Sequence, residues 1–147
     1  MSETNPIIRY GEFLIVPINT GKEQGKLWSY HIINISPLMR SSSQRSSAAT
    51  QLSNSNVSVI VPICNNIKPN RIRHRTANGV ESFNTRVGLD QETGIYGIRF
   101  DNVNPSHNFV VSFTTPRRKA VDQSIGLFTN GITYKNQVIR SPGCEKA

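Results

Sequence analysis

The chain has 147 residues, with 17 Lys or Arg against 9 Asp or Glu, a formal charge of +8 and only 36% hydrophobic residues. This length suits a single domain over residues 1–147. The chain has no apolar run near the roughly 20 residues of a membrane helix, and its two cysteines are too few for a disulfide scaffold or a zinc knuckle. These features exclude a membrane protein, a knottin and a zinc finger. Because its start also lacks the pattern of a secretion signal, we expect a virion or cytoplasmic location.

Apolar residues recur with a period of two or in short runs, and nowhere keep a helical period beyond about two turns. The run 13–16 predicts a strand that is buried on both faces and ends at Pro17, followed by a loop over residues 22–26. Asn130-Gly131 predicts a two-residue hairpin turn. Further strands are predicted at residues 27–35, 57–63, 83–89, 94–100, 108–113, 125–128 and 132–139.

A short helix is predicted over residues 115–121, because Thr115 can cap it and Pro116 suits its first position. Short strands separated by Gly, Pro and Asn turns predict an all-β fold. We therefore expect an antiparallel β-sandwich, jelly roll or small barrel of about eight strands, with at most one short helix.

Residues 40–56 are dominated by Ser, Asn and Gln, and cannot bury enough apolar area to become ordered by themselves. A connection of this length inside a domain is usually functional or flexible. We expect either an ordinary mobile loop or an arm that becomes ordered against a neighbouring subunit or a nucleic acid.

Charge is distributed unevenly along the chain. Residues 24–80 contain no acidic residue, whereas four of the acidic residues fall between Glu81 and Asp101. This pattern predicts a molecule with a positive face kept for an anionic partner, of which nucleic acid is the commonest. A surplus that only maintains solubility is the other interpretation.

The sharpest motif is Arg71-Ile72-Arg73-His74-Arg75. In an extended strand its three arginines share one face, about 6.6 Å apart, with Ile72 and His74 on the other. Arginine suits bidentate phosphate contacts, so we predict nucleic-acid or other anion binding by Arg71, Arg73 and Arg75. An edge strand protected from aggregation by like charges is the alternative.

A second basic cluster, Arg117-Arg118-Lys119, falls at the start of the predicted helix, where cations oppose the helix dipole. An anionic partner shared with the first cluster would favour this placement, and a loop of solvated charges explains it equally well. Trp28, Tyr30 and Tyr96 can stack on bases or sugars, although core packing is the favoured interpretation for each.

Enzymatic chemistry finds little support. The three histidines, His31, His74 and His107, are isolated, and no metal-ligand spacing occurs. The arginines around His74 are expected to suppress its charged form. Cys64 and Cys144 are buried neighbours, a free pair or a disulfide. We predict no catalytic residues, no metal and no cofactor.

Three functions fit these features. The first is a self-assembling structural protein, such as a viral or phage capsid, decoration or tail subunit, with copies of itself as partner and a basic face toward nucleic acid. The second is a cytoplasmic nucleic-acid-binding β-barrel module. The third is a glycan-binding β-sandwich that uses Trp28 or the tyrosines.

Overall fold

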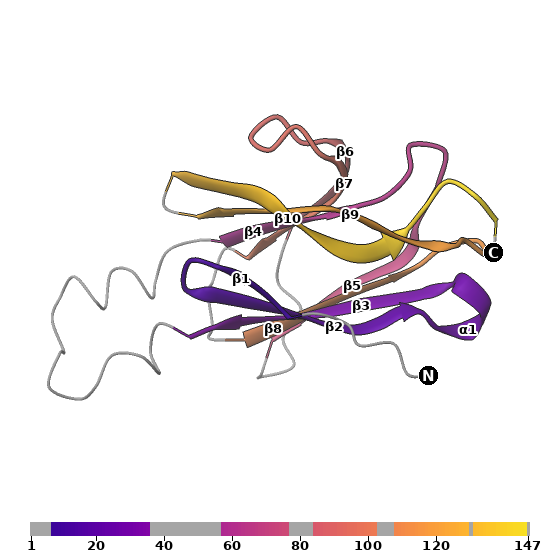
Figure 1. Cartoon of the computed structure of the whole chain (residues 1–147), viewed down its shortest axis with the longest axis horizontal. Helices are drawn as coiled ribbons and strands as arrows, with labels where there is room; N and C mark the ends of the chain where they lie inside the picture. The colour runs from indigo at the N-terminus through magenta and orange to yellow at the C-terminus, as the bar shows by residue number, and fades with distance from the viewer. Residues whose placement is uncertain (1–6, 36–56, 77–83, 103–107, 130, 147) are drawn as a thin grey trace, which may run out of the picture.

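Two antiparallel five-stranded sheets pack face to face as a β-sandwich, seen edge-on as two layers in Figure 1. The computed structural model describes residues 7–35, 57–76, 84–102, 108–129 and 131–146. The predicted all-β sandwich is confirmed, with ten strands and one short helix among the described residues. The Ser/Asn-rich segment 40–56 and Glu81 lie outside them.

Sheet A, the lower layer in Figure 1, joins strands from both halves of the chain, and sheet B is the upper layer. In spatial order, sheet A consists of β1 (Ile8–Tyr10), β2 (Phe13–Gly21), β3 (Leu27–Asn34), β8 (Asn108–Thr114) and β5 (Asn70–Thr76). Sheet B consists of β10 (Ile132–Pro142), β9 (Ala120–Thr129), β4 (Val57–Pro62), β7 (Tyr96–Asn102) and β6 (Asn84–Leu89). The predicted two-residue hairpin is confirmed, since Thr129 pairs with Ile132 and Gly131 has a φ of 74°.

The core lies between the sheets and is made of alternate residues of their strands. Trp28, Tyr30 and Ile32 of β3 are fully buried, as the alternation predicts. The indole Nε1 of Trp28 donates a hydrogen bond to Thr115 Oγ1 at 2.9 Å, and the Tyr30 hydroxyl donates to the carbonyl oxygen of Arg140 at 2.7 Å. These two aromatic side chains are therefore core residues with satisfied polar ends, and no ligand can stack on them in this fold.

The prediction that the first long strand ends at Pro17 is wrong, because β2 continues to Gly21. Strand β1 pairs only with residues 13–15, so on that side no neighbour requires the missing N–H of Pro17. On the other side, a bulge between Pro17 and Asn19 relieves the pairing with β3. Leu14 and Val16 are half-buried, so this strand is not buried on both faces as predicted.

The predicted helix over residues 115–121 is absent, and β9 begins at Ala120. Thr115 does not cap a helix because its hydroxyl accepts the hydrogen bond from Trp28 and its N–H donates to the carbonyl oxygen of Lys26. The one short helical element in the described part of the chain is α1 (Lys22–Gly25), a single tight turn within the predicted loop over residues 22–26. Glu23 and Gln24 there have left-handed φ angles of 58° and 63°.

The two long sides of the sandwich differ. On the β1–β10 side, the Tyr10 hydroxyl donates to the carbonyl oxygen of Ile125 at 2.8 Å and accepts from the Gln137 N–H at 2.7 Å, which links the sheets. On the opposite side, which we call the open side, sheet A ends at β5 and sheet B ends at β6. A disulfide joins Cys64, just after β4, to Cys144, just after β10, which resolves the three alternatives left by the sequence.

No helix in the described ranges is long and apolar enough to cross a membrane.

Candidate functional site

Strand β5 carries the first arginine motif along the exposed edge of sheet A. Arg71, Arg73 and Arg75 are exposed, whereas Ile72 packs against the core and His74 is 1% exposed. The predicted separation of the arginines from Ile72 and His74 is therefore confirmed. Because β5 is an edge strand, its position fits both an anion-binding role and the protection of an edge by like charges.

A bulge at the start of β5 changes the spacing of the three arginines. Asn70 pairs with Thr114 and Arg73 pairs with Ser112, so two residues of β5 oppose one residue of β8. Arg71 lies in this bulge with a left-handed φ of 52°. The even spacing predicted for all three arginines is thus wrong for Arg71, and only Arg73 and Arg75 keep the regular strand spacing of about 6.6 Å.

The second basic cluster lies in the connection between β8 and β9, beside α1. The Arg117 guanidinium donates to Gln24 Oε1 at 2.6 Å, and the Arg118 N–H donates to the carbonyl oxygen of Gly25 at 3.0 Å. Lys119 Nζ lies 4.0 Å from an oxygen of Glu145, with both side chains mostly exposed. These residues are therefore held in a turn rather than at a helix start.

The fold brings only part of the two clusters to one place. Thr114, the last residue of β8, pairs with Asn70, so Arg71 lies at the end of sheet A that leads into Arg117. Arg75 pairs with Val110, farther along the sheet. Arg71 and Arg117 thus share one end of sheet A, while Arg73 and Arg75 extend the positive charge along its edge.

The five strands of sheet A contain four arginines and no acidic residue. On the face turned away from the core, the register places Arg75 in a row with Val110, His31 and Val16, and Arg73 in a row with Ser112 and Ser29. We call this surface the basic face. Its exposed or half-buried members are Arg9, Leu14, Val16, His31, Ile33, Arg73, Arg75, Asn108, Val110 and Ser112, whereas Ser29 is buried.

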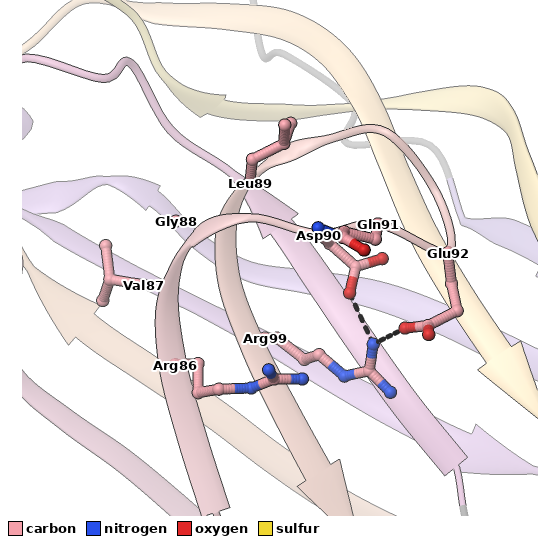
Figure 2. A pocket seen from close by; sticks show the side chains of 8 residues that line it. All are labelled: Arg86, Val87, Gly88, Leu89, Asp90, Gln91, Glu92 and Arg99. Carbon is pink, nitrogen blue, oxygen red and sulfur yellow. Dashed lines mark hydrogen bonds and ion pairs between the residues drawn. The ribbon is translucent and has the colours of Figure 1, made fainter.

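Sheet B has a different charge arrangement. Arg99 forms ion pairs with Asp101 at 2.7 Å, with Asp90 at 2.5 Å and with Glu92, and Figure 2 shows the last two carboxylates reaching its guanidinium. Burial disfavours the charge of Arg99, but its hydrogen bonds to the three carboxylates raise its pKa. The charge of this cation is therefore already compensated.

Asp90 is the best-buried member of this ion-pair group. Burial disfavours its ionised form, but hydrogen bonds from Thr93 and Arg99 outweigh that effect and lower its pKa. The cavity of about 260 Å³ around this group is lined by Arg86–Glu92 and by Arg99 (Figure 2). Its lining carries both signs of charge, so it lacks the single-sign character of the basic face.

His74 is neutral at pH 7, because burial lowers its pKa to about 4. The sequence correctly predicted that the charged form of His74 is disfavoured, but the cause is burial. The neighbouring arginines, which were the expected cause, are exposed to solvent. The ring packs 4.8 Å from that of Phe109, centroid to centroid. Among the described residues, no group of three or more His, Cys, Asp or Glu side chains is placed to hold a metal ion.

A cavity of about 610 Å³ on the open side was not predicted from the sequence. Residues 65–70 form one wall, and Val87 and Tyr96 line the remainder. Asn65 and Asn66 were the available sequence signal, as two polar turn residues directly after a buried strand. Their proximity to Tyr96 depends on the pairing of β4 with β7, which the sequence alone does not predict.

Comparison with protein families, with curated proteins and with solved structures identifies no match to this chain. The chemistry of the basic face and of the open side is therefore the basis for a functional proposal.

Proposed function

We propose that this protein is a self-assembling structural subunit, such as a capsid, decoration or tail protein of a virus or phage, and that its basic face lies against nucleic acid. The observation that carries the nucleic-acid part is the combination of four arginines and no acidic residue in sheet A. A polyanion meets no like charge from these strands, which lowers the electrostatic cost of contact over the whole sheet.

The chemistry of the basic face suits phosphates in particular. Arg73 and Arg75 project from alternate positions about 6.6 Å apart, close to the phosphate spacing of an extended strand. Each guanidinium can donate two parallel hydrogen bonds to one phosphate. Ser112 of β8 pairs with Arg73, and its hydroxyl adds a neutral donor of the kind that commonly contacts the nucleic-acid backbone.

Strand β6 supports the self-assembly part of the proposal. It forms the edge of sheet B, and its side chains Val87 and Leu89 are 45% and 64% exposed. An edge strand with exposed apolar side chains presents free backbone donors and acceptors, and so favours pairing with a strand of another chain. Copies of the same chain are the partner that assembly would supply.

A monomeric nucleic-acid-binding module would use the same basic face, and differs only in lacking the assembly. The glycan-binding alternative loses Trp28 and Tyr30, since both are fully buried. Light scattering after size-exclusion chromatography separates the first two functions, because the proposal predicts oligomers or particles. A strict monomer at high protein concentration, with no particles visible by electron microscopy, would contradict self-assembly.

Nucleic-acid binding is tested by reversing two charges of the basic face. The double variant Arg73→Glu/Arg75→Glu should bind an oligonucleotide at least about tenfold more weakly, because it removes two phosphate contacts and adds repulsion. The matched control Lys135→Glu/Lys146→Glu has the same net charge but changes exposed residues that are not part of sheet A. Equal losses in the two variants would refute a localised site.

A further inference from the structure

We infer that the cavity on the open side is a pocket for an unpaired base, so that the nucleic acid bound by this protein is single-stranded. The inference rests on the proposed function, because the arginines of β5 supply the contacts to the backbone of the same strand.

The cavity lies directly beside the arginine motif. Its wall of residues 65–70 leads into β5, whose first residue is Asn70 and whose next is Arg71. It is a recess open to solvent, and its volume of about 610 Å³ is large enough to receive a small planar group. A strand whose phosphates lie along β5 thus has a recess of suitable size within reach of its bases.

Tyr96 provides an aromatic surface in this recess. Its ring packs partly against the core, which fixes its orientation, while the residue keeps part of its surface exposed. The Tyr96 hydroxyl makes no hydrogen bond within the described part of the chain. A rigid, accessible aromatic ring is the feature on which single-stranded nucleic-acid-binding proteins stack bases.

The rim of the cavity carries polar groups that are free to bind a ligand. Asn66 and Asn70 are exposed, and their side-chain amides make no hydrogen bond among the residues that the structure describes. An amide offers two donors and an acceptor, which matches the mixed pattern on the edge of a base. Lys68 is exposed beside them and forms no ion pair in the described ranges.

This combination favours a single-stranded nucleic acid over the other ligands that an aromatic ring and amides can bind. A neutral glycan has no charge to match Lys68 and Arg71. A duplex keeps its bases stacked and paired, so none can enter a side recess without unstacking. Only a strand with unpaired bases places a planar group in the cavity and phosphates on the arginines together.

The test compares three probes by fluorescence anisotropy: a short single-stranded oligothymidylate, a duplex of the same length, and polyphosphate of similar charge as competitor. Wild-type protein should bind the oligothymidylate about tenfold more tightly than either alternative, the amount expected from stacking one base. Tyr96→Leu should remove that preference and leave the affinity for polyphosphate unchanged. Tyr96→Phe, which keeps the ring, should retain the preference.

A second variant guards against a folding defect at Tyr96. Asn66→Ala changes an exposed turn residue and should weaken oligothymidylate binding about threefold, with no effect on polyphosphate. Equal wild-type affinity for all three probes, or competition by a neutral glycan at the cavity, would overturn the inference. Polyphosphate binding that depends on the arginines would still support the proposed function in that case. Failure of every polyanion to bind would overturn both.

Discussion

Removing the disulfide between Cys64 and Cys144 should destabilise the sandwich strongly. The two cysteines are 80 residues apart, with Cα atoms separated by 5.1 Å. Closing a loop of this length removes conformational entropy from the unfolded chain worth about 4.5 kcal/mol at 25 °C. A domain of this size typically has only about 5–15 kcal/mol of total stability, so the reduced chain should be close to its folding limit.

Local contacts around Cys144 explain why the native structure accommodates this crosslink. The Gly143 N–H donates to the carbonyl oxygen of Lys119 at 2.8 Å, and the Lys119 N–H donates to that of Glu145 at 2.9 Å. These bonds hold the C-terminal segment against the start of β9 whether or not the disulfide is present. The reduced protein should therefore keep its native fold, and lose stability chiefly through the greater freedom of its unfolded state.

The assay is urea unfolding followed by the fluorescence of Trp28, which is the chain's one tryptophan and is fully buried. With a slope of about 1.5 kcal/mol/M, a loss of 4.5 kcal/mol lowers the midpoint by about 3 M. Cys64→Ala/Cys144→Ala should match reduced wild-type protein, which controls for the reductant. Superimposable unfolding curves for oxidised and reduced protein would refute the reasoning.

Three further predictions concern the core. Burial lowers the pKa of His74 to about 4, against 6.5 in an unfolded chain, so on acidification the unfolded state takes up this proton first. Lowering the pH from 6.5 to 4 should therefore reduce the free energy of unfolding by about 3 kcal/mol. Urea midpoints that stay constant over this pH range would contradict the prediction. Gly97→Ala should prevent stable folding, because a Cβ there would lie 2.1 Å from the carbonyl oxygen of Val61; circular dichroism with a native thermal transition would count against this prediction. Tyr10→Phe should lower the free energy of unfolding, measured by chemical denaturation, by about 1–3 kcal/mol, because it leaves the Gln137 N–H without its acceptor. An equal loss in the control variant Tyr134→Phe would argue against that cause.

The features that the sequence predicted correctly are those that depend on neighbouring residues. Core packing, the favoured interpretation for Trp28 and Tyr30, is what the structure shows, and alternation separated Ile72 and His74 from the arginines, because the side-chain period of a strand is a local property. Gly131 marked a two-residue hairpin for the same reason, since positive φ is a requirement of one position.

The features that the sequence could not predict depend on partners far along the chain. Threonine is a common helix cap, but the Thr115 hydroxyl accepts a hydrogen bond from the indole of Trp28, which lies 87 residues away in the sequence. Pro17 is tolerated in β2 only because β1 is short and a bulge follows. The cavity beside β5 arises from the pairing of β4 with β7, which no local pattern encodes.

The most direct test of the central claim is the salt dependence of oligonucleotide binding by the wild-type protein and by Arg73→Glu/Arg75→Glu. Each phosphate contact to a single strand contributes about −0.7 to the slope of log affinity against log salt. The proposal predicts a clearly negative slope for the wild type that becomes shallower by about 1.4 in the double variant. A slope near zero, or one that the double variant leaves unchanged, would contradict a phosphate-binding role for the basic face.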